Sequence, residues 1–166
     1  MSQLSEAEED FHLKAEKMEV KKTVHIAIDD LAEKFDDQEN KTKPIKSPKF
    51  KVGETSLAVW VYPQYKNEKT GEYVAVYLQN EEKESVTATT TFSHASGVKK
   101  TFKNQEIATD WGYWGFTRSL APHKGFTRFL SHKAYKKWAK DHGDVFKLEV
   151  EITLHVKKPA QWISYR

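Results

Sequence analysis

The segment FKLEVEITLHV, residues 146–156, alternates apolar and polar side chains without interruption and decides the fold class. Successive side chains of a strand point to opposite faces, so this alternation predicts a strand with one buried face. Pro159 follows shortly, and we expect it to end the strand. The apolar members of the alternation are Phe146, Leu148, Val150, Ile152, Leu154 and Val156.

Similar patterns recur upstream, separated by polar turns. We expect Pro63 to end one of these strands, a Lys-rich turn to precede the last of them, and Trp60 and Phe92 to lie in the core. About seven short strands with polar turns and few helices are typical of an antiparallel β-sandwich, so the predicted class is mainly β. The predicted strands cover residues 23–28, 50–52, 57–62, 73–78, 86–92 and 105–116.

Two segments show helical spacing instead. Apolar residues recur every three or four positions from Phe126 to Trp138, which predicts an amphipathic helix over residues 126–141 with Gly143 past its end. Residues 3–19 carry a thinner apolar stripe and are expected to form a short helix, with an oligomerising role as one alternative, or a flexible leader. The expected organisation is a leader at 1–20, one domain at 21–158 and a tail at 159–166.

Composition narrows the classes of protein. A chain of 166 residues is most simply one domain. It has no apolar run near the roughly 18 residues that span a bilayer, and its first residues lack the pattern of a secretory signal. The absence of cysteine excludes disulfides, thiolate chemistry and cysteine-based zinc sites. We expect a cytoplasmic location, with the nucleus as the alternative, and no membrane partner.

The residues that usually carry catalysis are scattered. The seven histidines show no metal-ligand spacing, and no glycine-rich phosphate loop is present. The adjacent pairs Ser93-His94 and Ser131-His132 do not have the geometry that a nucleophile and its base require. We therefore expect no catalytic residues and no metal.

Charge is distributed unevenly along the chain. Residues 1–20 carry six acids and two lysines, whereas residues 122–142 carry six Lys or Arg and a single acid. Bases interleaved with aromatics suggest polyanion or nucleic-acid binding as an alternative function. The favoured interpretation is the solvated face of the predicted helix, so nucleic acid is not the expected partner.

The order of these segments resembles the MATH domain, the meprin and TRAF homology family. The resemblance implies an eight-stranded antiparallel sandwich that binds short extended peptides without catalysis or cofactor. It also suggests the recognition part of an adaptor in ubiquitin-related signalling, and it leaves a homo-oligomer open. The matching pieces are HIAIDDLAEKF (25–35), SPKF (47–50), LAVWVYP (57–63), YVAVYL (73–78), VTATTTF (86–92), GFTRFL (125–130) and the final alternating strand.

The same resemblance implies a peptide groove on one sheet. Tyr77 matches the groove tyrosine, Gly125 and Phe126 match the end of the family's Trp-Gly-Phe motif, and Phe116 matches an aromatic ten residues earlier. The periodicity of Phe126 fits a place in the core equally well. Lys124 stands where that motif has tryptophan, and Thr90 stands where ubiquitin-ligase adaptors of the family have a groove phenylalanine.

A second register instead takes Trp114-Gly115-Phe116 as the motif, which leaves an insertion before the helix. We prefer the first register because the helix then follows Gly-Phe directly. In either register Trp111, Tyr113, Trp114 and Phe116 share one predicted strand, so that one pair faces the core and the other faces solvent.

Overall fold

The computed structural model describes residues 8–37, 43–67, 71–82, 84–108 and 123–164. These residues form nine strands, one α-helix and one short 3-10 helix. The elements are β1 (Phe11–Asp29), η1 (Leu31–Lys34), β2 (Ile45–Lys46), β3 (Phe50–Val52), β4 (Thr55–Asn67), β5 (Gly71–Asn80), β6 (Val86–His94), β7 (Lys99–Ile107), β8 (His123–Ser131), α1 (His132–His142) and β9 (Val145–Ser164).

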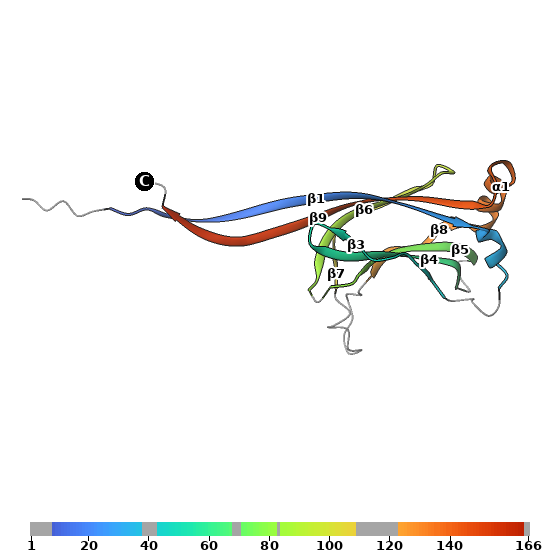
Figure 1. Ribbon diagram of the computed structural model, residues 1–166, viewed down its shortest axis with the longest axis horizontal. Helices are drawn as coiled ribbons and strands as arrows, with labels where there is room; N and C mark the ends of the chain where they lie inside the picture. The colour runs from blue at the N-terminus through green and yellow to red at the C-terminus, as the bar shows by residue number, and fades with distance from the viewer. Residues whose placement is uncertain (1–7, 38–42, 68–70, 83, 109–122, 165–166) are drawn as a thin grey trace, which may run out of the picture.

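The strands form two antiparallel sheets packed face to face (Figure 1). One sheet has the order β1-β9-β6-β7, and the other has the order β2-β4-β5-β8 with β3 also paired to β4. Helix α1 lies at one end of the sandwich, where it connects β8 of one sheet to β9 of the other. The predicted β-sandwich is confirmed.

The core lies between the sheets, where the alternating residues predicted it. In β9 the side chains of Phe146, Leu148, Val150, Ile152 and Leu154 are at most 2 % exposed, and Phe92 of β6 is fully buried. Burying a side chain of this size stabilises the fold by roughly 1.5–3 kcal/mol. The alternation in β9 therefore supplies one wall of the sandwich core.

Two prolines that were expected to end strands lie inside them. Strand β4 continues past Pro63 and β9 continues past Pro159. In each case the pairing register shifts at the proline, between Tyr62 and Tyr65 in β4 and opposite Ala15 in β9. Such a bulge leaves one residue out of the hydrogen-bonded ladder, so the missing N–H of proline is tolerated there. The predicted strand ends at Pro63 and Pro159 were wrong for this reason.

The predicted helix over 126–141 begins six residues too early, because residues 123–131 form strand β8. Between Phe126 and Leu130, β8 advances four residues while β5 advances two, from Val76 to Val74. This irregularity breaks the period of two and puts Phe126, Phe129 and Leu130 on the inner side at a spacing that imitates a helix. A local pattern cannot distinguish the two cases.

Helix α1 itself has clear local signals at both ends. The Ser131 hydroxyl accepts a hydrogen bond from the Ala134 N–H at 3.1 Å, as an N-cap residue does. Gly143 ends the helix with φ of 91°, as expected from the sequence, and its N–H donates to the Ala139 carbonyl at 2.7 Å. The His132 ring stacks on the Phe35 ring with their centroids 3.7 Å apart, and its Nε2–H donates a hydrogen bond to the Pro63 carbonyl at 2.6 Å.

The remaining differences concern the ends of the chain and β7. Residues 11–20, expected as a helix or leader, belong to β1, which pairs with β9 along its whole length. The same pairing carries β9 through residues 159–164, which were expected to form a tail. The Lys-rich turn is part of β7, which begins six residues before the predicted start at residue 105. The rest of the predicted 105–116 strand, from residue 109, lies outside the described residues.

Candidate functional site

A row of side chains crosses the outer face of the five-stranded sheet. The strand register places Lys46 of β2 opposite Trp60 of β4, Trp60 opposite Tyr77 of β5, and Tyr77 opposite Gly125 of β8. Directly opposed residues point to the same face of a sheet, so the four lie on one surface. Their inner-face neighbours Val59, Val61, Val76 and Leu78 are at most 1 % exposed.

Aromatic contacts make this surface continuous. The ring centroids of Tyr77 and Tyr62 lie 5.7 Å apart and those of Tyr77 and His123 lie 4.9 Å apart, and the rings of each pair are nearly perpendicular. The Lys46 ammonium lies 4.3 Å from the centre of the Trp60 ring, which is within the range of a cation–π interaction. Tyr77 is only 8 % exposed, whereas Trp60, Tyr62 and His123 are half-buried. We call Trp60, Tyr62, Tyr77 and His123 the outer aromatic cluster.

At Gly125 the backbones of β8 and β5 approach each other closely. A Cβ added there would lie 1.9 Å from the Val76 carbonyl oxygen and 2.6 Å from the Tyr77 Cα. Both contacts are with backbone, which cannot move aside as the end of a flexible side chain can. Glycine is therefore required at this position, and because it has no side chain, no atoms project from the sheet directly beside Tyr77.

Strand β8 forms the edge of its sheet next to the outer aromatic cluster. Within the described residues β8 pairs with β5 alone, so the backbone groups of its other edge face away from the sheet. An edge of this kind can accept an additional extended strand through main-chain hydrogen bonds. The residues that precede β8, 109–122, lie outside the described part of the chain.

A family model described as the MATH domain matches residues 23–152, which is more than half of the chain. The chain belongs to the MATH domain family. No curated protein matches it. The MATH domain is a non-catalytic protein-interaction fold, which agrees with a site built from a sheet face and a strand edge.

The MATH fold brings together only part of the predicted site. Tyr77 and Gly125 lie opposite each other on the outer face. Lys124 and Phe126, the neighbours of Gly125, oppose Leu78 and Val76 and therefore lie on the side that faces the other sheet. Phe126 approaches Phe92 at 6.1 Å and Phe102 at 6.4 Å, so it contributes to packing between the sheets.

The other three predicted residues are not part of this surface as described. Thr90 lies in the opposite sheet and is fully buried, so it has no surface that a ligand could contact. Trp114 and Phe116 lie outside the described residues, together with the predicted strand that holds Trp111 and Tyr113. The two registers of the Trp-Gly-Phe motif therefore both stay open.

The sequence reasoning missed three members of the site and misplaced a fourth. Trp60 was expected in the core, but it is half-buried on the outer face, and Lys46, Tyr62 and His123 were not singled out. The parity of β4 carried the signal, because Leu57, Val59 and Val61 occupy one face and leave Trp60 and Tyr62 for the other. His123 and Lys46 become neighbours of the cluster only through strand pairing.

Two further classes of site find no support in the described residues. No group of three or more His, Asp or Glu side chains among them is arranged to hold a metal ion. In the same part of the chain, no helix has the length and apolar character needed to cross a membrane.

Proposed function

We propose that this MATH domain captures a short extended peptide of a partner protein along the edge of β8 that points away from β5. The observation that supports it best is the position of that edge beside the outer aromatic cluster. Backbone hydrogen bonds to β8 would supply affinity, and the aromatic side chains would select side chains of the peptide. Gly125 keeps the surface low enough for a chain to pass next to Tyr77.

Trp114 and Phe116 belong to the same proposal, because the family resemblance that selects Tyr77 and Gly125 also selects them. Lys124 distinguishes this domain from members that have tryptophan at the position. Lys124 and Phe126 lie on the side of β8 that faces the other sheet, so we leave them out of the proposed contact surface. We leave Thr90 out of the proposed contact surface because it is buried.

Within the cell we propose the role of a recognition or adaptor module in ubiquitin-related signalling, in the cytoplasm or nucleus. The support for this wider role is the resemblance to a family that includes ubiquitin-ligase adaptors. A partner enzyme would supply the chemistry, and this domain would supply the recognition.

A selection of random peptides on the purified domain tests the proposal. We expect a convergent motif that is lost with His123→Ala and with Phe116→Ala. His25→Ala is the matched control, because His25 is an exposed histidine of β1 in the other sheet. Tyr77 is tested with Tyr77→Phe, which keeps the ring. Tyr77→Ala would remove a ring that is 8 % exposed and would therefore also destabilise the fold. Enrichment that is unchanged by His123→Ala and Phe116→Ala would contradict the proposed groove.

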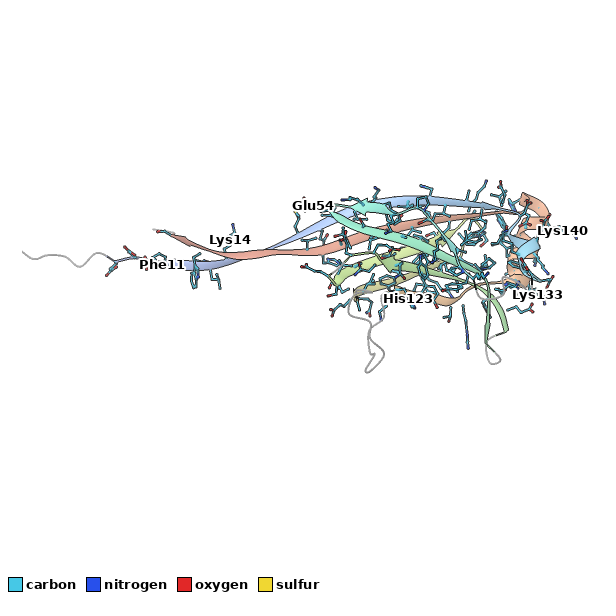
Figure 2. The ribbon with its side chains drawn as sticks, turned by 60° about the horizontal axis from the view of Figure 1, so that its bottom comes forward. Phe11, Lys14, Glu54, His123, Lys133 and Lys140 are labelled. Carbon is cyan, nitrogen blue, oxygen red and sulfur yellow. The ribbon has the colours of Figure 1, made fainter. Side chains whose placement is uncertain are left out.

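One observation favours polyanion binding as a second candidate function. The exposed face of α1 carries Lys133, Lys136, Lys137 and Lys140 at helical spacings of three and four, so their charges form one stripe. Figure 2 shows Lys133 and Lys140 at the helix end of the sandwich, apart from His123. Phosphate binding there should weaken steeply between about 50 and 200 mM salt, whereas peptide capture on β8 should not.

A further inference from the structure

Strands β1 and β9 continue beyond the sandwich as a two-stranded ribbon (Figure 1). Strand β6 pairs with β9 only from Leu148 to His155. Residues 11–18 of β1 and 156–164 of β9 therefore pair with each other, and no third strand joins them in the described part of the chain. Phe11 and Lys14 lie far out on this ribbon in Figure 2. Two paired strands are marginally stable in water, and a third strand or a packed face is usually needed.

The ribbon also carries the exposed apolar surface of the described chain. The large hydrophobic side chains that are exposed there are Phe11 (58 %), Leu13 (48 %), Met18 (41 %) and Trp162 (68 %), and all four belong to the ribbon. Leu13 lies directly opposite Trp162, and Phe11 is two residues from Leu13, so these three share one face. Apolar residues that gather on one projecting element are typical of an interaction surface.

The two edges of the ribbon differ in what they can accept. The β9 edge contains Pro159 and the bulge beside it, and both features obstruct the addition of a strand. Strand β1 contains neither proline nor glycine over 19 residues, and its own pairing with β9 is its only sheet pairing among the described residues. A partner strand would therefore add to β1.

We propose that this partner is β1 of a second copy of the chain, paired antiparallel about a two-fold axis at residue 15. In this register Glu8 and Glu9 oppose Lys22 and Lys21, Lys14 opposes Glu16, and no like charges oppose each other. A two-fold axis requires opposed residues to have the same parity, because they point to the same face. Each other axis from residue 13 to residue 18 puts a like-charged pair in opposition: Asp10 with Glu16, Lys14 with itself, Glu16 with itself, Lys17 with itself, or Lys14 with Lys22.

The pairing produces a four-stranded sheet with the order β9-β1-β1-β9 across two copies. It gives each ribbon the additional strands that it lacks alone. Phe11, Leu13 and Trp162 of both copies then lie on the same face of this four-stranded sheet. The sandwiches lie at opposite ends, so the β8 edge stays accessible and the dimer would present two copies of it.

Sedimentation equilibrium tests the proposal by comparing the dimer dissociation constant of the full chain with those of variants in which opposed charges are exchanged. Lys21→Glu creates two like-charge pairs with Glu9, and we expect it to weaken dimerisation about tenfold. The double variant Glu9→Lys, Lys21→Glu restores opposite charges and should restore the wild-type dissociation constant. Lys21 opposes the uncharged Thr153 of β9 in its own copy, so Lys21→Glu places no like charge directly opposite it within one copy. Lys147→Glu, an exposed lysine at the other end of β9, is the matched control and should have no effect.

A cross-linking experiment tests the register itself, because the natural chain has no cysteine. Residue 12 of one copy opposes residue 18 of the other, so a mixture of His12→Cys and Met18→Cys should form a disulfide-linked dimer on oxidation. Each variant alone places its cysteines six residues apart along the ladder, about 20 Å, and should not cross-link. A chain that is monomeric at every concentration, a dimer indifferent to Lys21→Glu, or equal cross-linking in the single variants would overturn the proposal.

Discussion

His94 should make the stability of this domain depend on pH in a way that one substitution can isolate. Its side chain is 4 % exposed and lies among the rings of Tyr135, Trp138 and Phe146, at centroid distances of 5.7, 4.8 and 4.9 Å. The Ser96 N–H donates to its Nδ1 at 3.0 Å, so the neutral ring carries its proton on Nε2. Burial among these rings lowers the pKa of His94 from 6.5 to about 4.

The direction of the effect follows from where the proton binds. Above pH 6.5 the ring is neutral in both the folded and the unfolded chain, and the full stability is present. As the pH falls from 6.5 to about 4, His94 binds a proton in the unfolded chain but not in the folded chain, so the free energy of unfolding decreases. The interval of about 2.5 pH units corresponds to about 3 kcal/mol, which is a large fraction of the stability of a small domain.

Urea unfolding of wild type and His94→Asn at a series of pH values between 7 and 4 measures this contribution. The asparagine oxygen can still accept from the Ser96 N–H, but it does not titrate. His94→Asn should lower stability at pH 7, because it leaves space among the rings, and it should flatten the pH dependence by about 3 kcal/mol. His132, whose pKa burial also lowers, titrates equally in both proteins and cancels in the difference. Parallel pH profiles for the two proteins would refute the reasoning.

Three further predictions concern stability. Gly125→Ala should destabilise the domain by about 1–3 kcal/mol and weaken peptide capture, because the new Cβ forces β8 away from the Val76 carbonyl; an unchanged urea midpoint would contradict this. Ser131→Ala should cost about 1 kcal/mol through loss of the N-cap of α1, and Ser131→Asp should largely preserve stability in thermal unfolding. Asp144→Ala should cost about 1–3 kcal/mol, because the Tyr135 hydroxyl loses its acceptor at 2.8 Å. The double variant Tyr135→Phe, Asp144→Ala should lose less stability than the sum of the losses in the two single variants. Strict additivity of the two losses would argue against the hydrogen bond.

Part of the candidate site could be predicted from the sequence, and the limit has a physical cause. The motifs around Tyr77 and Gly125 were sufficient to select two residues that face each other on the outer sheet surface. Phe126 and Lys124 are adjacent to Gly125 in sequence, but alternation places them on the other side of β8. Trp60 and His123 join the site through pairing with β5 and through ring contacts, and neither interaction is visible in a local pattern.

What the sequence by itself determined is the class of the fold and the inward face of most strands, because a period of two is a local property and burial follows from it. Only the tertiary structure decided where strands continue past Pro63 and Pro159, since a bulge depends on the partner strand. It likewise decided that residues 126–131 form a strand, where an irregular ladder imitates helical spacing. The ribbon of β1 and β9 is the clearest case. Residues 11–20 show no strand pattern of their own, and they are extended because β9 lies beside them.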